Sequence, residues 1–221
     1  MKKFLFLFIG IVLSINLFGT AQYPDKIIYN GKEYKLHTNP LETFFAKNPD
    51  LKPKTEVMSS ALWRGYVATF EIRDNQLYVK DIEIQYFDKT DENNSTTKWK
   101  SVLKEVFPNQ TDIKVDWISG LIILPEGELV EYVHMGYGSL YENYILLEME
   151  NGKLLKEKKL DYKEYEKYTE RQYKEFKKTD EYKNIVKELK EGSKDMKMSD
   201  KEMDDFLKSY LTSYKTIILK D

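Results

Sequence analysis

Leu62-Trp-Arg-Gly-Tyr-Val-Ala-Thr-Phe-Glu-Ile72 opens the part of the chain that decides the fold. Residues of opposite character alternate along it, and a similar alternation runs from Leu77 to Phe87, as expected of strands with one cleaner apolar face. Four polar residues, 73–76, separate the two segments and have the length of a hairpin turn. The sequence therefore predicts an antiparallel pair of strands over residues 62–72 and 77–87.

Further strands are predicted on both sides of this pair. Asn30-Gly31 lies between the apolar segments 27–29 and 33–36, and both residues tolerate the positive φ of a two-residue hairpin turn. Turn residues at regular spacing then separate five more short apolar segments: 113–118, 121–124, 129–135, 141–149 and 154–160. These patterns favour an antiparallel sheet made of hairpins and a meander.

Two short helices are expected among the strands. Asn39-Pro40 offers an N-cap and a proline suited to the first helical position, so a helix should start there and end before Pro49. Thr97 is expected to cap a second amphipathic helix, which ends at Pro108.

The C-terminal part of the chain is predicted to be helical. Its Lys- and Glu-rich segment carries a stripe of aromatic residues that slips at Thr179-Asp180, which indicates a break or kink. Ser199 and Glu202 have the spacing of a capping box at the start of a last helix. We therefore expect one α+β domain over residues 22–221, mainly β over 22–160, with the helical segment 161–221 packed on the sheet.

Residues 1–21 are predicted to be a signal peptide. Two lysines precede an apolar run from Phe4 to Leu13, and small residues lead to Ala21, after which cleavage is expected. The run is shorter than the roughly 20 residues that span a bilayer. The mature chain would begin at Gln22, in the periplasm or outside the cell, with no membrane span.

Composition excludes several classes of function. The chain contains no cysteine, so disulfides, thiolate nucleophiles and cysteine-based metal sites are excluded. Only two histidines are present, and neither a metal site nor a cofactor is expected. Removal of residues 1–21 takes the formal net charge from −2 to −4 because two lysines are lost. This acidic balance argues against nucleic acid as a partner.

The first candidate site lies on the segment that opens the pair of strands. Arg64 could hold a carboxylate or phosphate beside the aromatic platforms of Trp63 and Tyr66, with Glu71 on the opposite face. In the alternative, structural interpretation, Arg64 lies over an aromatic ring or pairs with a neighbouring acid, and Gly65 marks a bulge or a close backbone approach.

The second candidate site follows the segment 129–135. His134 could act as a general acid or base oriented by Glu142 or Glu71, and the glycines around Tyr137 would allow a ligand close to the backbone. Alternatively, His134 is a half-buried structural residue and the glycines serve a hairpin turn.

Three functions follow from these features as hypotheses. The first is a non-catalytic module that binds a ligand or an envelope or extracellular protein. The second is a hydrolase of envelope or extracellular polymers that uses carboxylate and histidine side chains. The third is an interaction protein whose C-terminal helices expose their tyrosine stripe to a partner.

Overall fold

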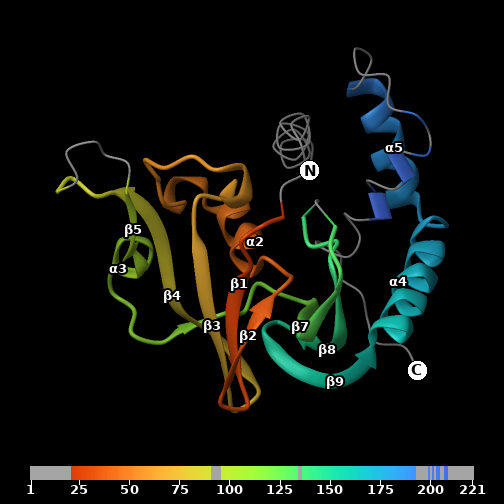
Figure 1. Ribbon diagram of the computed structural model, residues 1–221, viewed down its shortest axis with the longest axis horizontal. Helices are drawn as coiled ribbons and strands as arrows, with labels where there is room; N and C mark the ends of the chain where they lie inside the picture. Colours follow the sequence, from red (N-terminus) through yellow and green to blue (C-terminus); the bar gives the residue numbers. More distant parts are fainter. Residues whose placement is uncertain are drawn as a thin grey trace.

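The computed structural model describes residues 21–90, 96–133 and 136–192, together with residues 199, 201, 203, 204, 207 and 208. Within these residues nine strands form one mixed, mostly antiparallel sheet, with short helices between strands and longer helices after them (Figure 1). The predicted α+β class with an antiparallel sheet and C-terminal helices packed on it is therefore confirmed. The strands are β1 Asp25–Tyr29, β2 Lys32–Leu36, β3 Val67–Arg73, β4 Gln76–Phe87, β5 Thr97–Ser101, β6 Ile113–Lys114, β7 Gly120–Glu131, β8 Leu140–Glu150 and β9 Lys153–Asp161.

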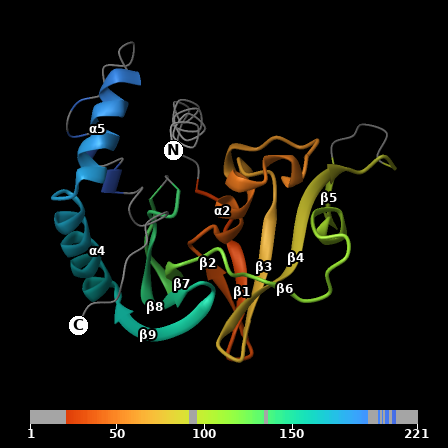
Figure 2. The ribbon, with the colours of Figure 1, turned by 180° about the vertical axis from the view of Figure 1, so that it is seen from behind.

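The helices fall into two groups. Short ones lie among the strands: α2 Pro40–Lys47, the 3-10 turns η1 Pro49–Leu51 and η2 Ser60–Leu62, and α3 Leu103–Val106. The longer ones, α4 Tyr162–Phe176 and α5 Asp180–Gly192, follow the last strand. Seen from both sides, α4 and α5 lie at the opposite flank of the molecule from β5 and α3 (Figure 2).

The sheet has the strand order β2-β1-β3-β4-β9-β8-β7, with β5 and β6 also paired to β4. One pairing between these strands, β1 with β3, is parallel. The amide of His37, just after β2, donates to the carbonyl of Ile123 on β7 at 2.9 Å. The sheet therefore curls until the two ends of the path meet.

Both predicted hairpins at the start of the chain are present. Asn30 and Gly31 have φ of 50° and 76° between β1 and β2. Asp74 and Asn75 have φ of 49° and 59° between β3 and β4. Two successive residues at positive φ match the right-handed twist of the flanking strands, and Asn, Asp and Gly tolerate that backbone conformation best.

The first predicted strand is too long at its start. Residues 60–62 form the turn η2, Gly65 has φ of 83°, and β3 begins only at Val67. A positive φ interrupts the extended backbone, so the alternation before Val67 does not belong to a strand. The predicted alternation of burial holds only at Trp63, which is exposed beside the buried Arg64, because all residues from 64 to 68 are buried, including Gly65 and Val67 on the predicted opposite face.

The segment after residue 96 also differs from the prediction. Thr97 begins β5, which pairs with residues 83–87 of β4, and the helix that follows is only the single turn α3. The strand predicted over 113–118 is reduced to β6. The two strands predicted over 121–124 and 129–135 form the continuous β7, whose pairing with β8 shifts register after Glu126. A bulge thus absorbs the break that Pro125 and Gly127 suggest.

The first core fills the space inside the curled sheet. Alternate residues of the strands point into it, since Ile122 and Leu124 of β7 face inward while Leu121 and Ile123 face outward. Aromatic side chains close it: Phe44 of α2 packs on Phe107, just after α3, and on Trp117, after β6. Its most deeply buried members are Ile27, Leu36, Leu41, Tyr66, Ala68, Phe70, Leu77, Ile82, Val115, Ile122, Leu124 and Leu147.

The second core lies on the outer face of β7, β8 and β9, beneath the C-terminal helices. The predicted break at Thr179-Asp180 separates α4 from α5. The capping box that starts α4 joins Asp161 and Glu164. The tyrosine stripe faces the sheet instead of solvent, and the buried members of this core are Leu121, Ile123, Tyr144, Leu146, Leu160, Tyr168, Tyr173, Phe176, Met203 and Leu207.

The start of the predicted last helix lies partly within the described residues. The amide of Met203 donates to the carbonyl of Ser199 at 3.0 Å, whereas Glu202, the other half of the predicted capping box, is outside them. None of the helices in the described ranges has the length and apolar content needed to cross a bilayer.

Candidate functional site

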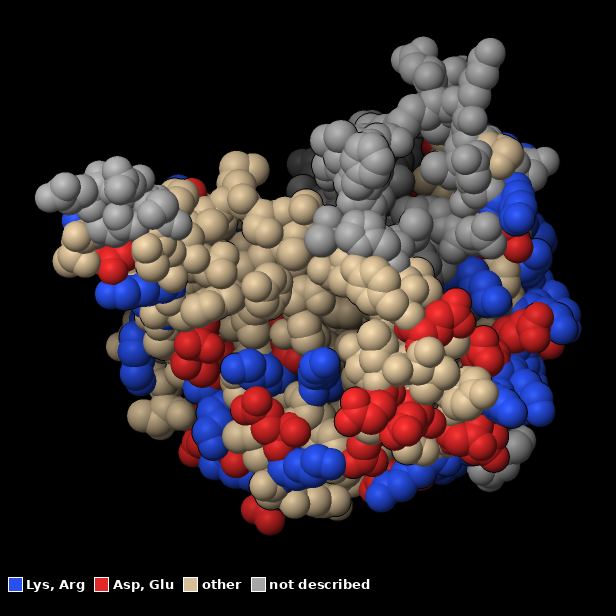
Figure 3. All heavy atoms as spheres, viewed as in Figure 1, with Lys and Arg blue, Asp and Glu red and all other residues tan. Residues whose placement is uncertain are grey.

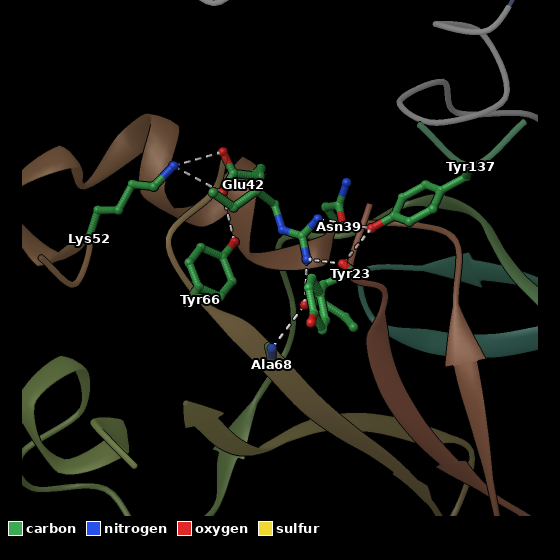
Figure 4. A network of polar contacts seen from close by, with 9 residues as sticks. Tyr23, Asn39, Glu42, Lys52, Tyr66, Ala68 and Tyr137 are labelled. Carbon is green, nitrogen blue, oxygen red and sulfur yellow. Dashed lines mark hydrogen bonds and ion pairs between the residues drawn. The ribbon is translucent and has the colours of Figure 1, made fainter. Parts of the chain in front are cut away.

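Arg64 occupies the centre of a buried polar network. Its guanidinium donates from Nη1 to the Tyr137 hydroxyl at 2.9 Å, and from Nη2 to the Tyr23 carbonyl and to Asp25 Oδ1, each at 3.0 Å. The Tyr137 hydroxyl in turn donates to Asn39 Oδ1 at 2.9 Å. Figure 4 shows these groups converging from separate segments of the chain. The arrangement corresponds to the structural interpretation, in which Arg64 pairs with an acid of its own chain.

The ion pair of Arg64 with Asp25 is almost completely withdrawn from water. The two side chains are 1% and 0% exposed. Burial raises the pKa of the Asp25 carboxyl, against the opposing effects of the Arg64 charge and of the Ala68 amide, which donates to Oδ1 at 2.8 Å. Burial alone would lower the pKa of Arg64, but the adjacent Asp25 raises it above its ordinary value. The guanidinium therefore stays charged and fixed to its internal partners.

A second group of contacts continues the network toward the surface. The Tyr66 hydroxyl donates to Glu42 of α2 at 2.7 Å, and Lys52 Nζ donates to both oxygens of Glu42 at 3.1 Å. Lys52 Nζ also lies 5.5 Å from the centroid of the Trp63 ring, within range of a cation–π contact. Lys52 is about one third exposed, so this is where the network reaches solvent.

The backbone around Gly65 explains how neighbouring side chains reach opposite environments. The tight turn over residues 62–65, closed by the Gly65 amide on the Leu62 carbonyl at 2.9 Å, directs Trp63 outward at 39% exposure and Arg64 inward at 2%. A Cβ on Gly65 would lie 3.0 Å from Thr55 Cγ2, and the positive φ adds strain for any other residue.

His37 and Tyr137 form a stacked pair next to this network. Their ring centroids are 4.7 Å apart with 12° between planes. Burial lowers the pKa of His37 to about 3, and the charge of Lys35 acts in the same direction. His37 is therefore neutral at physiological pH, and the stack helps to fix the ring of Tyr137.

The predicted site residues fall into two groups in the structure. Contacts bring together Trp63, Arg64, Tyr66 and Tyr137. Glu71 on β3 instead pairs with Arg73 and Lys80 at 3.4 and 3.5 Å, and Glu142 on β8 accepts the Glu128 amide at 3.0 Å. No contact among the described residues joins either carboxylate to the network. His134 lies outside the described residues.

Sequence reasoning missed the partners that complete the network, above all Asp25. The signal was available in the printed sequence, because Asp25 shares a strand face with Ile27 and Tyr29. A carboxylate on the buried face of a strand requires a cationic or hydrogen-bonding partner. Tyr23, Asn39 and Glu42 carry no comparable signal.

Exposed apolar side chains gather at the end of the molecule that contains this network. Tyr23 packs on Trp99 with ring centroids 6.1 Å apart, and its amide donates to the Ala61 carbonyl at 2.9 Å, close to Trp63. The exposed upper part of β7 and the residue following it lie at the same end (Figure 1). We name as the apolar end the exposed large apolar side chains carried by the segments at this end of the molecule (Figure 1): Tyr23 before β1, Leu51 in η1, Met58 and Trp63 before β3, Trp99 on β5, Leu129 and Val130 on β7, and Tyr132 just after β7.

The opposite end of the molecule has a different surface. Nine large apolar or aromatic side chains are exposed in the described part of the chain, and only Leu155, on β9, lies away from the apolar end. Figure 3 shows Lys, Arg, Asp and Glu crowded over the lower part of this face, and a broad area without them above, over α2 and the segment before β3. Exposed apolar side chains gathered away from the charged surface are typical of an interaction site.

Other kinds of site have less support in the structure. Within the described ranges, no group of three or more His, Asp or Glu side chains is placed to hold a metal ion. A cavity of about 200 Å³ on β7, β8 and β9 is lined by Glu126, Asn143, Lys159, Asp161 and their neighbours, and it shares no residue with the Arg64 network.

Comparison of the chain with known proteins identified no relative. No protein-family model matches the chain, and no curated protein and no solved structure is significantly similar to it.

Proposed function

We propose that this chain is an exported, non-catalytic binding module that binds a protein partner through the apolar end. The observation that carries the proposal is the gathering of eight of the nine exposed large apolar side chains of the described residues at one end. Most monomeric proteins scatter such side chains singly, and exposed apolar side chains gathered at one end of a molecule are typical of an interaction surface.

The composition of the apolar end favours a protein as its partner. Two tryptophans, two tyrosines and a methionine belong to it, and these residue types are enriched in the centres of protein interfaces, where charged residues are depleted. Met58 is 94% exposed, so a flexible apolar side chain projects into solvent. A nucleic acid or an anionic bilayer would require a basic surface, and Figure 3 shows no such concentration of lysine and arginine there.

The export part of the proposal rests on residues 1–21. Ala21, after which cleavage is expected, forms a bridge with Gly136, and the Gln22 amide donates to the Gly136 carbonyl at 3.2 Å. The expected first residue of the mature chain is thus attached to the folded part beside Tyr23. Cleavage at this point would remove Ala21 and its bridge to Gly136 but no residue of the apolar end.

Site-specific photo-crosslinking tests the proposal. Met58 is replaced by photo-reactive p-benzoylphenylalanine in the full chain, expressed in its own cells, and Leu155 is replaced likewise as the control, because it is 52% exposed and lies outside the apolar end. We expect an adduct with a second protein from position 58 and none from position 155. Once that protein is identified, Trp63→Ala should weaken its binding about 30-fold, the loss of an aromatic hot spot worth about 2 kcal/mol.

Three outcomes would overturn the assignment of a protein partner. Equal adducts from both positions would show that the apolar end is not selective. An adduct of twice the chain mass would identify a second copy as the occupant. Absence of any adduct, combined with cosedimentation of the mature chain with phosphatidylcholine vesicles, would identify a membrane surface instead.

A further inference from the structure

The Arg64 network joins the segments that carry the apolar end. Nη2 of Arg64 donates to the carbonyl of Tyr23, an exposed member of the apolar end. Trp63, another exposed member, immediately precedes Arg64 in the chain. Nη1 of Arg64 binds Tyr137, which lies in the connection that follows the exposed part of β7. Through Tyr137 the network reaches Asn39, just before α2. One guanidinium therefore connects segments that are far apart in the sequence.

Stability alone is a poor explanation for this ion pair. Two charges buried to this extent lose their hydration, and replacing such a pair by apolar residues of similar volume is often neutral or stabilising. A planar guanidinium instead offers several donors in fixed directions, whereas a lysine ammonium acts as a compact point charge on a flexible stem. The contribution that only Arg64 can make here is geometric.

Tyr137, at the other side of the network, is also fixed by several contacts. The Tyr137 hydroxyl accepts from Arg64 and donates to Asn39, and its ring stacks on His37. Both its polar and its aromatic parts are thus fixed. Within the described residues, Tyr137 thus ties its part of the connection between β7 and β8 to the Arg64 network.

We propose that Arg64 and Tyr137 are positioning residues, which hold the segments of the apolar end in the arrangement that the partner recognises. This inference rests on the proposed function and assigns Arg64 a role without any contact to the partner. It replaces the sequence-based hypothesis that Arg64 binds a ligand directly.

Two conservative substitutions test the inference. Arg64→Lys retains the positive charge beside Asp25 but cannot reach Tyr137 and Tyr23 at the same time. Tyr137→Phe retains the stack on His37 and removes only the hydroxyl. Tyr173→Phe is the matched control, because its hydroxyl bonds Asp204 in the helical part. If Arg64→Lys fails to fold, Tyr137→Phe decides the question.

Two measurements are made on each variant. Hydrogen exchange reports the local arrangement, with the amide of Tyr23, which donates to Ala61, as the most direct reporter. We expect Arg64→Lys and Tyr137→Phe to speed its exchange about tenfold while the amides of α4 keep their protection. The yield of the photo-adduct at position 58 should fall about tenfold, as for an interface that loses pre-organisation. Tyr173→Phe should change neither value.

The outcomes separate this inference from the proposed function. Unchanged exchange at Tyr23 in both variants would overturn the positioning role and leave the proposed function intact. Faster exchange with an unchanged adduct would also overturn it, because binding would not depend on the arrangement. Faster exchange in α4 as well would indicate general destabilisation and would overturn it too. Absence of an adduct in the unsubstituted chain would refute the proposed function, and this inference with it.

Discussion

The two cores of the molecule are closed in different ways. The first core is enclosed by strands of the curled sheet, and most of its members are aliphatic or phenyl side chains with almost no exposure. The second core is one outer sheet face covered by helices, and tyrosines supply much of its contact: Tyr144 stacks on Tyr165 with centroids 3.7 Å apart. Several of its neighbours, such as Tyr162 and Tyr182, are only partly buried. The comparison suggests that the first core determines the sheet and the second attaches the helices to it.

The largest effect should come from removing a phenyl ring in each core. Phe70→Ala empties a fully buried position of the first core, and Phe176→Ala empties a position 5% exposed in the second. We expect Phe70→Ala to lower the free energy of unfolding by about 3–5 kcal/mol and to destabilise the whole molecule. Phe176→Ala should cost less because the helical side of its core can relax.

Urea unfolding with two probes separates these effects. All three tryptophans lie at positions 63, 99 and 117, so their fluorescence reports the strand-rich part of the chain. Far-ultraviolet circular dichroism also reports the helices. In Phe176→Ala the dichroism transition should precede the fluorescence transition, whereas in Phe70→Ala the two should coincide. Coincident transitions in both variants would mean that the two cores form one cooperative unit.

The second-largest effect should be the dependence of stability on pH, which differs between the two cores. His37, beside Leu36 of the first core, has its pKa lowered from 6.5 to about 3 by burial. The unfolded chain therefore takes up a proton first, and stability falls as the pH drops from 6.5 toward 3. Between pH 7 and pH 5 the loss should be about 2 kcal/mol. The tyrosines of the second core do not titrate in this pH range, because burial raises the pKa of Tyr144 and of Tyr168 to about 12. They therefore contribute no loss of stability between pH 7 and pH 5.

His37→Phe provides the check on this pH dependence. The substitution keeps an aromatic ring against Tyr137, so the fold should persist. The free energies of unfolding obtained from urea titrations at pH 7 and at pH 5 should differ by about 2 kcal/mol less in the variant than in the unsubstituted chain. If the free energy of unfolding changed equally between pH 7 and pH 5 in both proteins, the pH dependence would belong to groups other than His37.

The smallest effect is expected from one hydroxyl of the second core. Tyr173 donates to Asp204 Oδ1 at 2.7 Å and also contacts the Asp204 carbonyl at 3.1 Å. Tyr173→Phe should lower the free energy of unfolding by about 1 kcal/mol, a typical value for one hydrogen bond. The Tyr173 bond is also the main cause of the lowered pKa of Asp204, followed by Lys177.

Carboxyl chemical shifts provide a second measurement on this variant. The pKa of Asp204 should move back toward its ordinary value when the Tyr173 hydroxyl is removed. A lowered pKa that persists would attribute the effect to Lys177, which lies 2.9 Å from Asp204.

The features that could be predicted from the sequence are local ones. The turns at Asn30-Gly31 and at 73–76, the start of α2 at Pro40 and the break between α4 and α5 depend on residues close together in the chain. Their backbone requirements can be read from residue type, since φ at a turn or a cap is decided by the residue itself. These elements were predicted within a few residues of their observed bounds.

The features that could not be predicted depend on distant partners. Thr97 to Ser101 adopt strand instead of helix because β4 offers them a free edge, a tertiary effect that outweighs local preference. Arg64 could be noted as unusual, but its carboxylate is 39 residues away at Asp25. The apolar end could not be predicted either, because it also depends on residues distant in the sequence: Tyr23 and Trp99 meet only in the folded chain.

The parallel pairing of β1 with β3 has a consequence for the order of folding. Asp25 and Ala68, which this pairing brings together, are 43 residues apart, so their contact must wait for a long loop to close. The hairpins β1–β2 and β3–β4 close over short turns within microseconds. We therefore expect the sheet to assemble by the docking of two finished hairpins, edge to edge. In that case the ion pair forms late, and substitutions at Arg64 should speed unfolding more than they slow folding.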